Sequence, residues 1–262
     1  MVAMATVMAD ACDSCVASKL RVLCLHGYGQ DAGSFRSKIG DFWWATKSLL
    51  DLVFIDAPHI IEKDVHSEWE IVAQHYGSLT VKGTKITLSS LSRLKKPMHT
   101  VIHVNCVHCG PGGRGWWISG SAREFEESVK AIEQACKTEG PCDGILGFSQ
   151  GACMTAMILS LQCLKQVECS FKFGVLVSGF QSRTCPQDHL FAKEGSIDVP
   201  TLHIIGDNDT IIPKERAIEL LPFFVSPCVL YHPGGHSLPT SSQCKKEYID
   251  FFKQMASTHS GT

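Results

Sequence analysis

Residues 143–164 read DGILGFSQGACMTAMILSLQCL, and this stretch carries the strongest signal of the fold. Its first six residues form a short apolar run, which is typical of a buried strand. Residues 150–164 are apolar on nearly every face of a helix, as expected for a helix that packs beside a sheet. Between them, GFSQG at 147–151 matches the pattern G-x-S-x-G, in which a tight strand-to-helix turn exposes a serine. The setting predicts that Ser149 is a nucleophile on a strained elbow rather than an ordinary turn serine.

The rest of the chain alternates between apolar, strand-like runs and amphipathic helical segments. Strands are predicted at residues 20–26, 52–55, 171–180, 201–207 and 228–233. Helices are predicted at residues 34–50, 121–137 and 214–221, and over a last apolar face that includes Tyr248 and Phe252. At the start of the second of these helices, Ser121 and Glu124 predict a capping box. The alternation predicts an α/β fold, a doubly wound and mostly parallel sheet with helices on both faces.

The same pattern predicts a single domain over residues 20–257, with a loose N-terminal tail at 1–19 and a C-terminal tail at 258–262. An irregular insertion interrupts the domain at residues 62–113. No Asp or Glu occurs from Ile71 to Gly120, and the periodicity there is weak. We expect either a lid over the site or an excursion that is largely disordered. A solvated loop is favoured over a binding surface for an anionic partner.

Composition and charge exclude several classes of protein. The chain has 24 Lys and Arg residues against 26 Asp and Glu, so its net charge of −2 provides no overall field for nucleic acid. No run of 18 apolar residues occurs, so we predict no integral membrane association. The N-terminal segment carries Asp10 and Asp13 without a basic region, which argues against a secretory signal. We expect a cytoplasmic location, with access to the nucleus possible. The sequence does not indicate an oligomeric state.

The cysteines do not predict a disulfide framework. There are 13 of them, an odd number without a repeating spacing. Cys12-x-x-Cys15 and Cys106-x-x-Cys109 have the spacing of zinc ligands. Both pairs lie outside the periodic core, so we interpret the spacing as chance and predict no metal site.

A serine hydroxyl needs a histidine base and a carboxylate that orients it, and in α/β-hydrolases these follow the serine in the order acid, then histidine. Two acids, Asp207 and Asp209, follow one predicted strand, and two histidines, His232 and His236, accompany the next. His236 is favoured because it lies on a loop preceded by glycines, whereas His232 is a strand residue. Spacing favours Asp209 only modestly, because Asp207 could merely cap the turn.

Acyl transfer also needs N–H donors directed at the oxyanion of the tetrahedral intermediate. The backbone N–H of Gln150, directly after the serine, is one candidate. The second is the N–H of Tyr28 in the loop after the first strand, where the small Gly27 allows close approach of the backbone. The alternative for this loop is a plain turn, with His26 as an ordinary hydrogen-bonded histidine.

Seven blocks of sequence occur in a fixed order, namely LCLHGYGQDAGSF, FIDAPH, RGWW, DGILGFSQGA, LVSGF, GDNDTIIP and GGHSLP. Together they resemble the FSH serine hydrolases over residues 20–60 and 114–256. The resemblance implies an α/β-hydrolase fold and hydrolysis of carboxylic esters with no metal and no cofactor. It also implies that Ser149 is the nucleophile, Asp209 the acid and His236 the base.

The stretch between Ile60 and Gly113 matches no block of that family. Trp116 and Trp117 lie in the RGWW block, and we predict that they either floor an acyl pocket or belong to the core. The expected reaction is hydrolysis of a small-molecule ester with an apolar acyl chain, through an acyl-enzyme. Two alternatives stay open: an acyl-thioesterase or protein deacylase, since the same triad cleaves thioesters, and a non-catalytic ligand-binding protein on a hydrolase fold.

Overall fold

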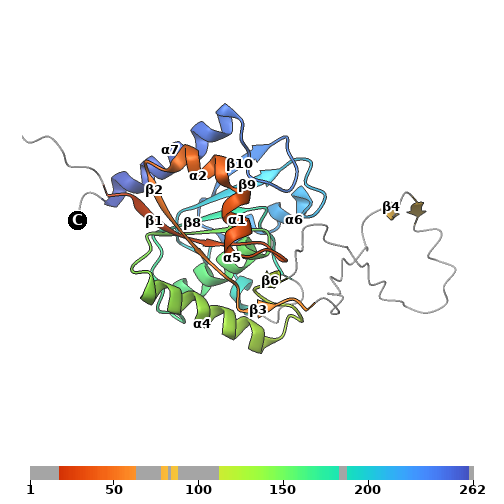
Figure 1. Cartoon of the computed structure of the whole chain (residues 1–262), viewed down its shortest axis with the longest axis horizontal. Helices are drawn as coiled ribbons and strands as arrows, with labels where there is room; N and C mark the ends of the chain where they lie inside the picture. The colour runs from red at the N-terminus through yellow and green to blue at the C-terminus, as the bar shows by residue number, and fades with distance from the viewer. Residues whose placement is uncertain (1–17, 63–77, 82–83, 88–111, 183–187, 260–262) are drawn as a thin grey trace, which may run out of the picture.

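The computed structural model describes residues 18–62, 78–81, 84–87, 112–182 and 188–259, and a six-stranded sheet forms its centre (Figure 1). The strand order is β10-β9-β8-β7-β1-β2, and all five pairings are parallel. The strands are β1 (Leu20–Leu25), β2 (Leu50–Ile55), β7 (Gly144–Phe148), β8 (Phe173–Val177), β9 (Thr201–Gly206) and β10 (Cys228–His232). The predicted parallel α/β sheet is therefore confirmed, and its strand order reverses direction between β1 and β7.

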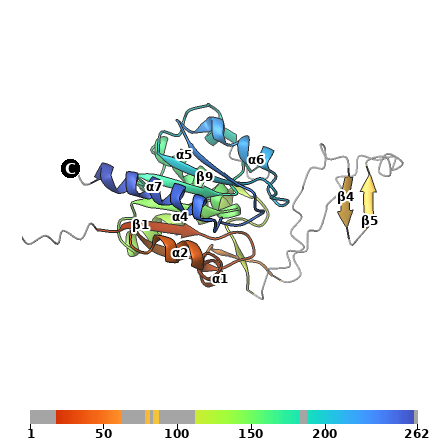
Figure 2. The same cartoon turned by 90° about the horizontal axis from the view of Figure 1, so that it is seen from above.

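Helices cover both faces of the sheet, as predicted. One face carries α1 (Ala32–Lys38), α2 (Gly40–Thr46) and α7 (Ser242–His259), and Figure 2 looks onto this face. The other face carries α4 (Ala122–Thr138) and α5 (Gln150–Cys163). Short elements complete the described chain: η1 (Asp188–Phe191), α6 (Lys214–Ile218) and η2 (Leu221–Phe223).

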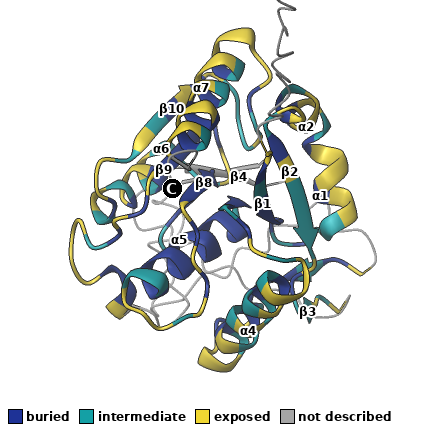
Figure 3. Cartoon of the chain, turned by 90° about the vertical axis from the view of Figure 1, so that its left-hand side faces the viewer, coloured by how far each residue is buried: buried dark blue, intermediate teal, exposed yellow. Residues whose placement is uncertain are grey.

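The strands divide the core into two layers because successive side chains point to opposite faces. In β1, Val22 and Cys24 pack with the first group of helices, whereas Leu23 and Leu25 pack with α4 and α5. Helix α5 is buried almost along its whole length, while α4 and α7 keep an exposed outer face (Figure 3). This explains why residues 150–161 are apolar all round, with no polar face.

The predicted helix at 34–50 is in fact two helices that meet at Ile39. Asp31 caps the first, since its Oδ1 accepts from the N–H of Ser34 at 2.7 Å. Ile39 is both the C-cap of α1 and the N-cap of α2, and Gly40, a poor residue for a helix interior, follows it directly. The turn allows Phe35 and Phe42 both to be buried against the sheet.

The capping box predicted at the start of α4 is half formed. Ser121 Oγ accepts from the N–H of Glu124 at 3.3 Å. The Glu124 carboxylate does not return the bond, because its Oε2 accepts from the N–H groups of Ile118, Ser119 and Gly120. The segment before α4 thus folds back toward the first turn of the helix. Its N–H groups use the Glu124 carboxylate that the predicted capping box would have used.

Two short antiparallel pairs occur at the predicted insertion, one between the segments that flank residues 62–113 and one within it. β3 (His59–Ile60) pairs with β6 (Arg114–Gly115), and β4 (Ser78–Val81) pairs with β5 (Thr84–Thr87). Residues 63–77, 82–83 and 88–111, most of the N-terminal tail and both C-x-x-C pairs lie outside the described residues, so the expectations of disorder and chance spacing stay predictions. Within the described ranges, no helix has both the length and the apolar character needed to span a membrane.

Candidate active site

Ser149 lies at the turn between β7 and α5 with φ 55° and ψ −115°, a left-handed conformation that non-glycine residues rarely adopt. Its N–H donates to the carbonyl oxygen of Val177 at the end of β8, at 2.9 Å. Among the described residues, its side chain makes no capping hydrogen bond with α5. The backbone is therefore held in a strained turn at the start of a helix, as predicted for a nucleophile elbow.

The two glycines of the motif are required by close contacts between backbones. A Cβ atom on Gly147 would lie 2.2 Å from the carbonyl oxygen of Gly151. A Cβ atom on Gly151 would lie 2.3 Å from the carbonyl oxygen of Leu25 in β1. Real Cβ atoms do not approach backbone atoms so closely, so the elbow can pack against β1 only with glycine at both positions.

Asp209 and His236 form a hydrogen-bonded pair above the ends of β9 and β10. His236 Nδ1 lies 2.8 Å from Asp209 Oδ2, and since a carboxylate only accepts, Nδ1 carries the proton and donates it. Asp209 Oδ1 accepts from the N–H groups of Ile211 and Ile212, each at 2.9 Å. Burial raises the pKa of Asp209, but the bonds from His236, Ile212 and Ser178 outweigh it and lower the pKa below its usual range.

His236 lies against the elbow, and its side chain is 18% exposed. Its ring centroid is 4.7 Å from that of Phe148, the residue before Ser149. The loops after β9 and β10 also touch each other closely, since a Cβ on Gly206 would lie 2.6 Å from the carbonyl oxygen of Gly235. The Asp209–His236 pair thus packs against the residue that precedes Ser149, at the carboxyl ends of parallel strands, the edge where ligands bind in open α/β sheets.

The competing acid and histidine lie elsewhere. The Asp207 side chain is 40% exposed and forms an ion pair with Lys214. His232 is 3% exposed within β10, and its Nδ1 accepts from the N–H of Gly234 at 3.2 Å. The geometry therefore pairs Asp209 with His236, the combination that the sequence favoured.

The loop after β1 holds Tyr28 in a tight turn beside the elbow. Gly27 N–H donates to the side-chain oxygen of Gln30 at 2.9 Å, and the N–H of Gly29 donates to the carbonyl oxygen of Arg114 at 2.9 Å. On the other side, Gln150 is the first residue of α5, and the first N–H groups of a helix have no acceptor within it. The N–H groups of Tyr28 and Gln150 stay the predicted oxyanion donors.

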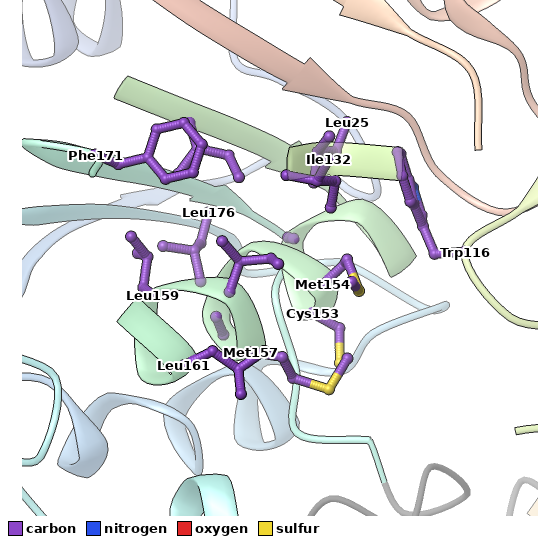
Figure 4. Close-up of a cluster of buried hydrophobic side chains, with 14 of the residues drawn as sticks. Leu25, Trp116, Ile132, Cys153, Met154, Met157, Leu159, Leu161, Phe171 and Leu176 are labelled. Carbon is purple, nitrogen blue, oxygen red and sulfur yellow. The ribbon is translucent and has the colours of Figure 1, made fainter. Parts of the chain in front are cut away.

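Trp116 and Trp117 are buried in the core, at 0% and 2% exposure, which favours the second of their two predicted roles. Figure 4 shows Trp116 beside the buried side chains of α5. The two tryptophans also fix the two loops of the site. The Gln150 side chain accepts from the N–H of Trp116 at 2.9 Å and donates to the carbonyl oxygen of Trp117 at 2.8 Å. Trp116 Nε1 donates to the carbonyl oxygen of His26 at 2.9 Å. The RGWW block therefore links the loop after β1 to the serine elbow through hydrogen bonds, and we call this link the clamp.

His26 has a structural role in that clamp. Its Nε2 accepts from the N–H of Ala57 at 3.0 Å, so the proton resides on Nδ1, which donates to the carbonyl oxygen of Gly27 at 2.8 Å. Burial lowers the pKa of His26, which keeps the ring neutral in this arrangement. The sequence offered this ordinary hydrogen-bonded histidine as the alternative.

Sequence reasoning missed two side chains. The amide of Gln150 joins the clamp, although only the backbone of that residue was considered. Ser178, in the LVSGF block after β8, donates through Oγ to Asp209 Oδ2 at 2.8 Å. The available signal was the strand order, because β8 lies between the strands that carry Ser149 and Asp209.

Solved structures share this fold. The Arabidopsis thaliana protein SOBER1 matches with a TM-score of 0.56 at 18% identity, covering 91% of this chain and 99% of that one. Zea mays acyl-protein thioesterase 2 matches with a TM-score of 0.53 at 13% identity, covering 91% and 94%. At these identities the likeness shows the α/β-hydrolase fold alone.

Sequence comparison gives the family. The chain is 36% identical over 249 residues to "Esterase OVCA2" of Danio rerio, covering 90% of this chain and 97% of the fish protein. It is 34% identical over 250 residues to "Esterase CG5412" of Drosophila melanogaster, covering 91% and 75%. The family model described as "Serine hydrolase (FSH1)" matches residues 16–248. The chain, with its serine elbow and its Asp–His pair, belongs to the FSH1 serine hydrolase family.

Proposed function

We propose that the protein hydrolyses carboxylic esters, with Ser149 as nucleophile, His236 as base and Asp209 as the acid that orients it. The observation that carries the proposal is the Asp209–His236 pair packed against the serine elbow. With its Nδ1 proton held by Asp209, the imidazole offers the lone pair of Nε2 as the base. Relatives named as esterases support the same chemistry.

In the first step, Ser149 Oγ attacks the ester carbonyl carbon while His236 Nε2 takes the hydroxyl proton. Asp209 stabilises the imidazolium that forms, and the N–H groups of Tyr28 and Gln150 hold the oxyanion of the tetrahedral intermediate. His236 then gives its proton to the departing alcohol, which leaves an acyl-enzyme on Ser149.

In the second step, water attacks the acyl-enzyme as His236 takes a proton from it. The tetrahedral intermediate collapses, the acid product leaves, and His236 returns the proton to Ser149. Every proton transfer in this cycle uses the same imidazole, so Asp209 contributes to both halves of the reaction.

We propose a small-molecule ester with an apolar acyl chain as substrate and the cytoplasm as the location. The second point rests on the cysteines: the eight that the described ranges contain are free thiols, and most of them are packed as small apolar side chains. The same triad would also attack a thioester, so the substrate series below includes one.

The test is labelling with a fluorophosphonate, together with turnover of two kinds of substrate. The first is a series of alkyl esters of increasing acyl-chain length, and the second is one acyl-thioester. Wild type should be labelled, and Ser149→Ala should lose the label and about 10³-fold or more of its turnover. Ser257→Ala, which removes a serine hydroxyl from the exposed end of α7, should retain both. Labelling or full turnover by Ser149→Ala would refute the mechanism, and faster cleavage of the thioester would favour the thioesterase alternative.

A further inference from the structure

Ser178 follows directly after β8 and points its hydroxyl at the acid of the triad. The residue is 1% exposed, and Oγ donates to Asp209 Oδ2 at 2.8 Å. The same oxygen accepts the Nδ1 proton of His236, also at 2.8 Å. The second carboxylate oxygen is occupied by two backbone N–H groups. Ser178 and His236 therefore share the charge of one oxygen.

The backbone of Ser178 is held in a conformation that a serine rarely adopts. Its φ is 50°, while its N–H donates to the carbonyl oxygen of Ile204 at 2.9 Å. A left-handed conformation is unfavourable for an L-residue with a side chain and persists only where its surroundings enforce it. Here it directs the hydroxyl at Asp209.

The end of β8 contacts two members of the triad at once. The carbonyl oxygen of Val177 accepts from the N–H of Ser149, and the next residue, Ser178, donates to Asp209. Two consecutive residues of the strand thus fix the backbone of the nucleophile and the carboxylate of the acid. A movement of this strand end would displace both.

We propose that Ser178 is a positioning residue of the triad, whose hydroxyl fixes the Asp209 carboxylate and sets the pH at which His236 becomes an active base. The inference rests on the proposed function. A hydrogen bond from the hydroxyl withdraws negative charge from Oδ2, the oxygen that faces the imidazole. Without it, the carboxylate would stabilise the imidazolium more strongly, and the base would lose its proton only at higher pH.

Other charged groups near His236 stay in place when Ser178 changes. The Lys38 ammonium, from the end of α1, lies 4.0 Å from the centroid of the Phe148 ring, which also packs against His236. On the β9 and β10 side, Asp207 is paired with Lys214, and His232 lies within β10. Loss of the Ser178 hydroxyl is therefore the one electrostatic change at the pair.

Two variants separate the hydroxyl from the backbone strain. Ser178→Gly and Ser178→Ala both remove the hydroxyl, but alanine keeps the backbone strain that Ser178 itself carries at φ 50°, whereas glycine relieves it. We expect both to shift the acid limb of the kcat/KM profile to higher pH and to lower kcat about tenfold at neutral pH, with little change in KM. The glycine variant should be the more thermally stable of the two, because it no longer carries the backbone strain.

Ser160→Ala is the matched control. This buried serine on α5 donates through Oγ to the carbonyl oxygen of Leu190 at 2.7 Å, away from the triad. Its loss should lower thermal stability and leave the acid limb unchanged. If neither Ser178 variant moves the acid limb, or if only Ser178→Ala moves it, the proposed role of the hydroxyl is wrong.

A second readout does not depend on turnover. The His236 ring proton on Cε1 can be titrated by NMR in wild type and in both Ser178 variants, with His236→Gln to assign the signal. The inference requires the midpoint to rise in both variants. If the midpoint shifts in a protein that neither takes the fluorophosphonate label nor cleaves esters, the proposed function is wrong but Ser178 still influences His236. If the midpoint does not shift in an active enzyme, only the proposed role of Ser178 is wrong.

Discussion

The serine elbow and the Asp–His pair form one site, but they are specified in different ways. The elbow is five consecutive residues, and its strained φ and the close contact between Gly147 and Gly151 follow from the turn itself, while Gly151 also meets Leu25 of β1. Asp209 and His236 are 27 residues apart and come from the loops after two different strands. The nucleophile is thus fixed mainly by the local geometry of the turn, whereas the acid and the base are selected by how neighbouring loops pack.

The two regions also differ in their energetics. The elbow holds backbone strain, which the packing of β1, β7 and α5 must balance. The pair instead buries a carboxylate whose side chain is 1% exposed, and four donors compensate for the lost water. Substitutions of the elbow glycines should therefore act on stability, and substitutions in the pair should act on chemistry.

The largest effect is expected from Asp209→Asn, which should lower kcat/KM on the order of 10³ to 10⁴-fold for alkyl esters. The amide removes the charge that stabilises the imidazolium and favours the wrong tautomer of His236. Steady-state kinetics and circular dichroism would show lost turnover in a folded protein.

Asp207→Asn is the matched control, two residues away. It removes only a partly exposed ion pair with Lys214, so kcat/KM should stay within about twofold of wild type. If Asp207→Asn were the more damaging variant, the geometric choice of Asp209 would be overturned, and with it the contrast between the two regions.

A smaller effect, on stability, is expected from Gly151→Ala. The new Cβ would meet the carbonyl oxygen of Leu25, so the free energy of unfolding should fall by about 2 to 4 kcal/mol, measured by urea denaturation. Gly33→Ala in α1 makes only an ordinary contact and should be neutral or stabilise by up to about 1 kcal/mol. Equal stabilities for the two variants would contradict the steric account of the elbow.

The smallest effect concerns His203, on the strand that leads to Asp209. Burial lowers its pKa to about 3, so between that value and its unfolded pKa near 6.5 the unfolded chain binds the proton more readily. Its contribution to stability is complete above about pH 6.5 and falls as the pH drops, by up to about 2 kcal/mol at pH 5.

His203→Leu should abolish that part of the pH dependence, measured as the free energy of unfolding between pH 7 and pH 5. The exposed His189 provides the control, and His189→Gln should leave the slope as in wild type. A wild-type slope that survives in His203→Leu would show that another group is responsible, and the acid sensitivity would then be sought at His26 and His232, whose pKa values burial also lowers.

Sequence periodicity predicted much of the fold, including every strand of the central sheet and its parallel character. It failed where a competing contact decided the detail. Gly40 and two buried phenylalanines divide one predicted helix into two, and three N–H groups take the Glu124 carboxylate away from its cap. Hydrophobic periodicity cannot reveal these two details, because each depends on how a neighbouring segment of the chain packs against the helix.

The site shows the same division. The sequence by itself determined Ser149 and its elbow, because a strand, a glycine-flanked serine and a buried helix in succession leave the backbone little choice. The sequence already favoured Asp209 over Asp207, and the structure adds the hydrogen bond that joins Asp209 to His236. The bonds between Gln150 and the two tryptophans, and the bond from Ser178 to the carboxylate, are seen only in the tertiary structure. The reason is physical: those contacts join the carboxyl ends of strands that are adjacent in space but distant along the chain.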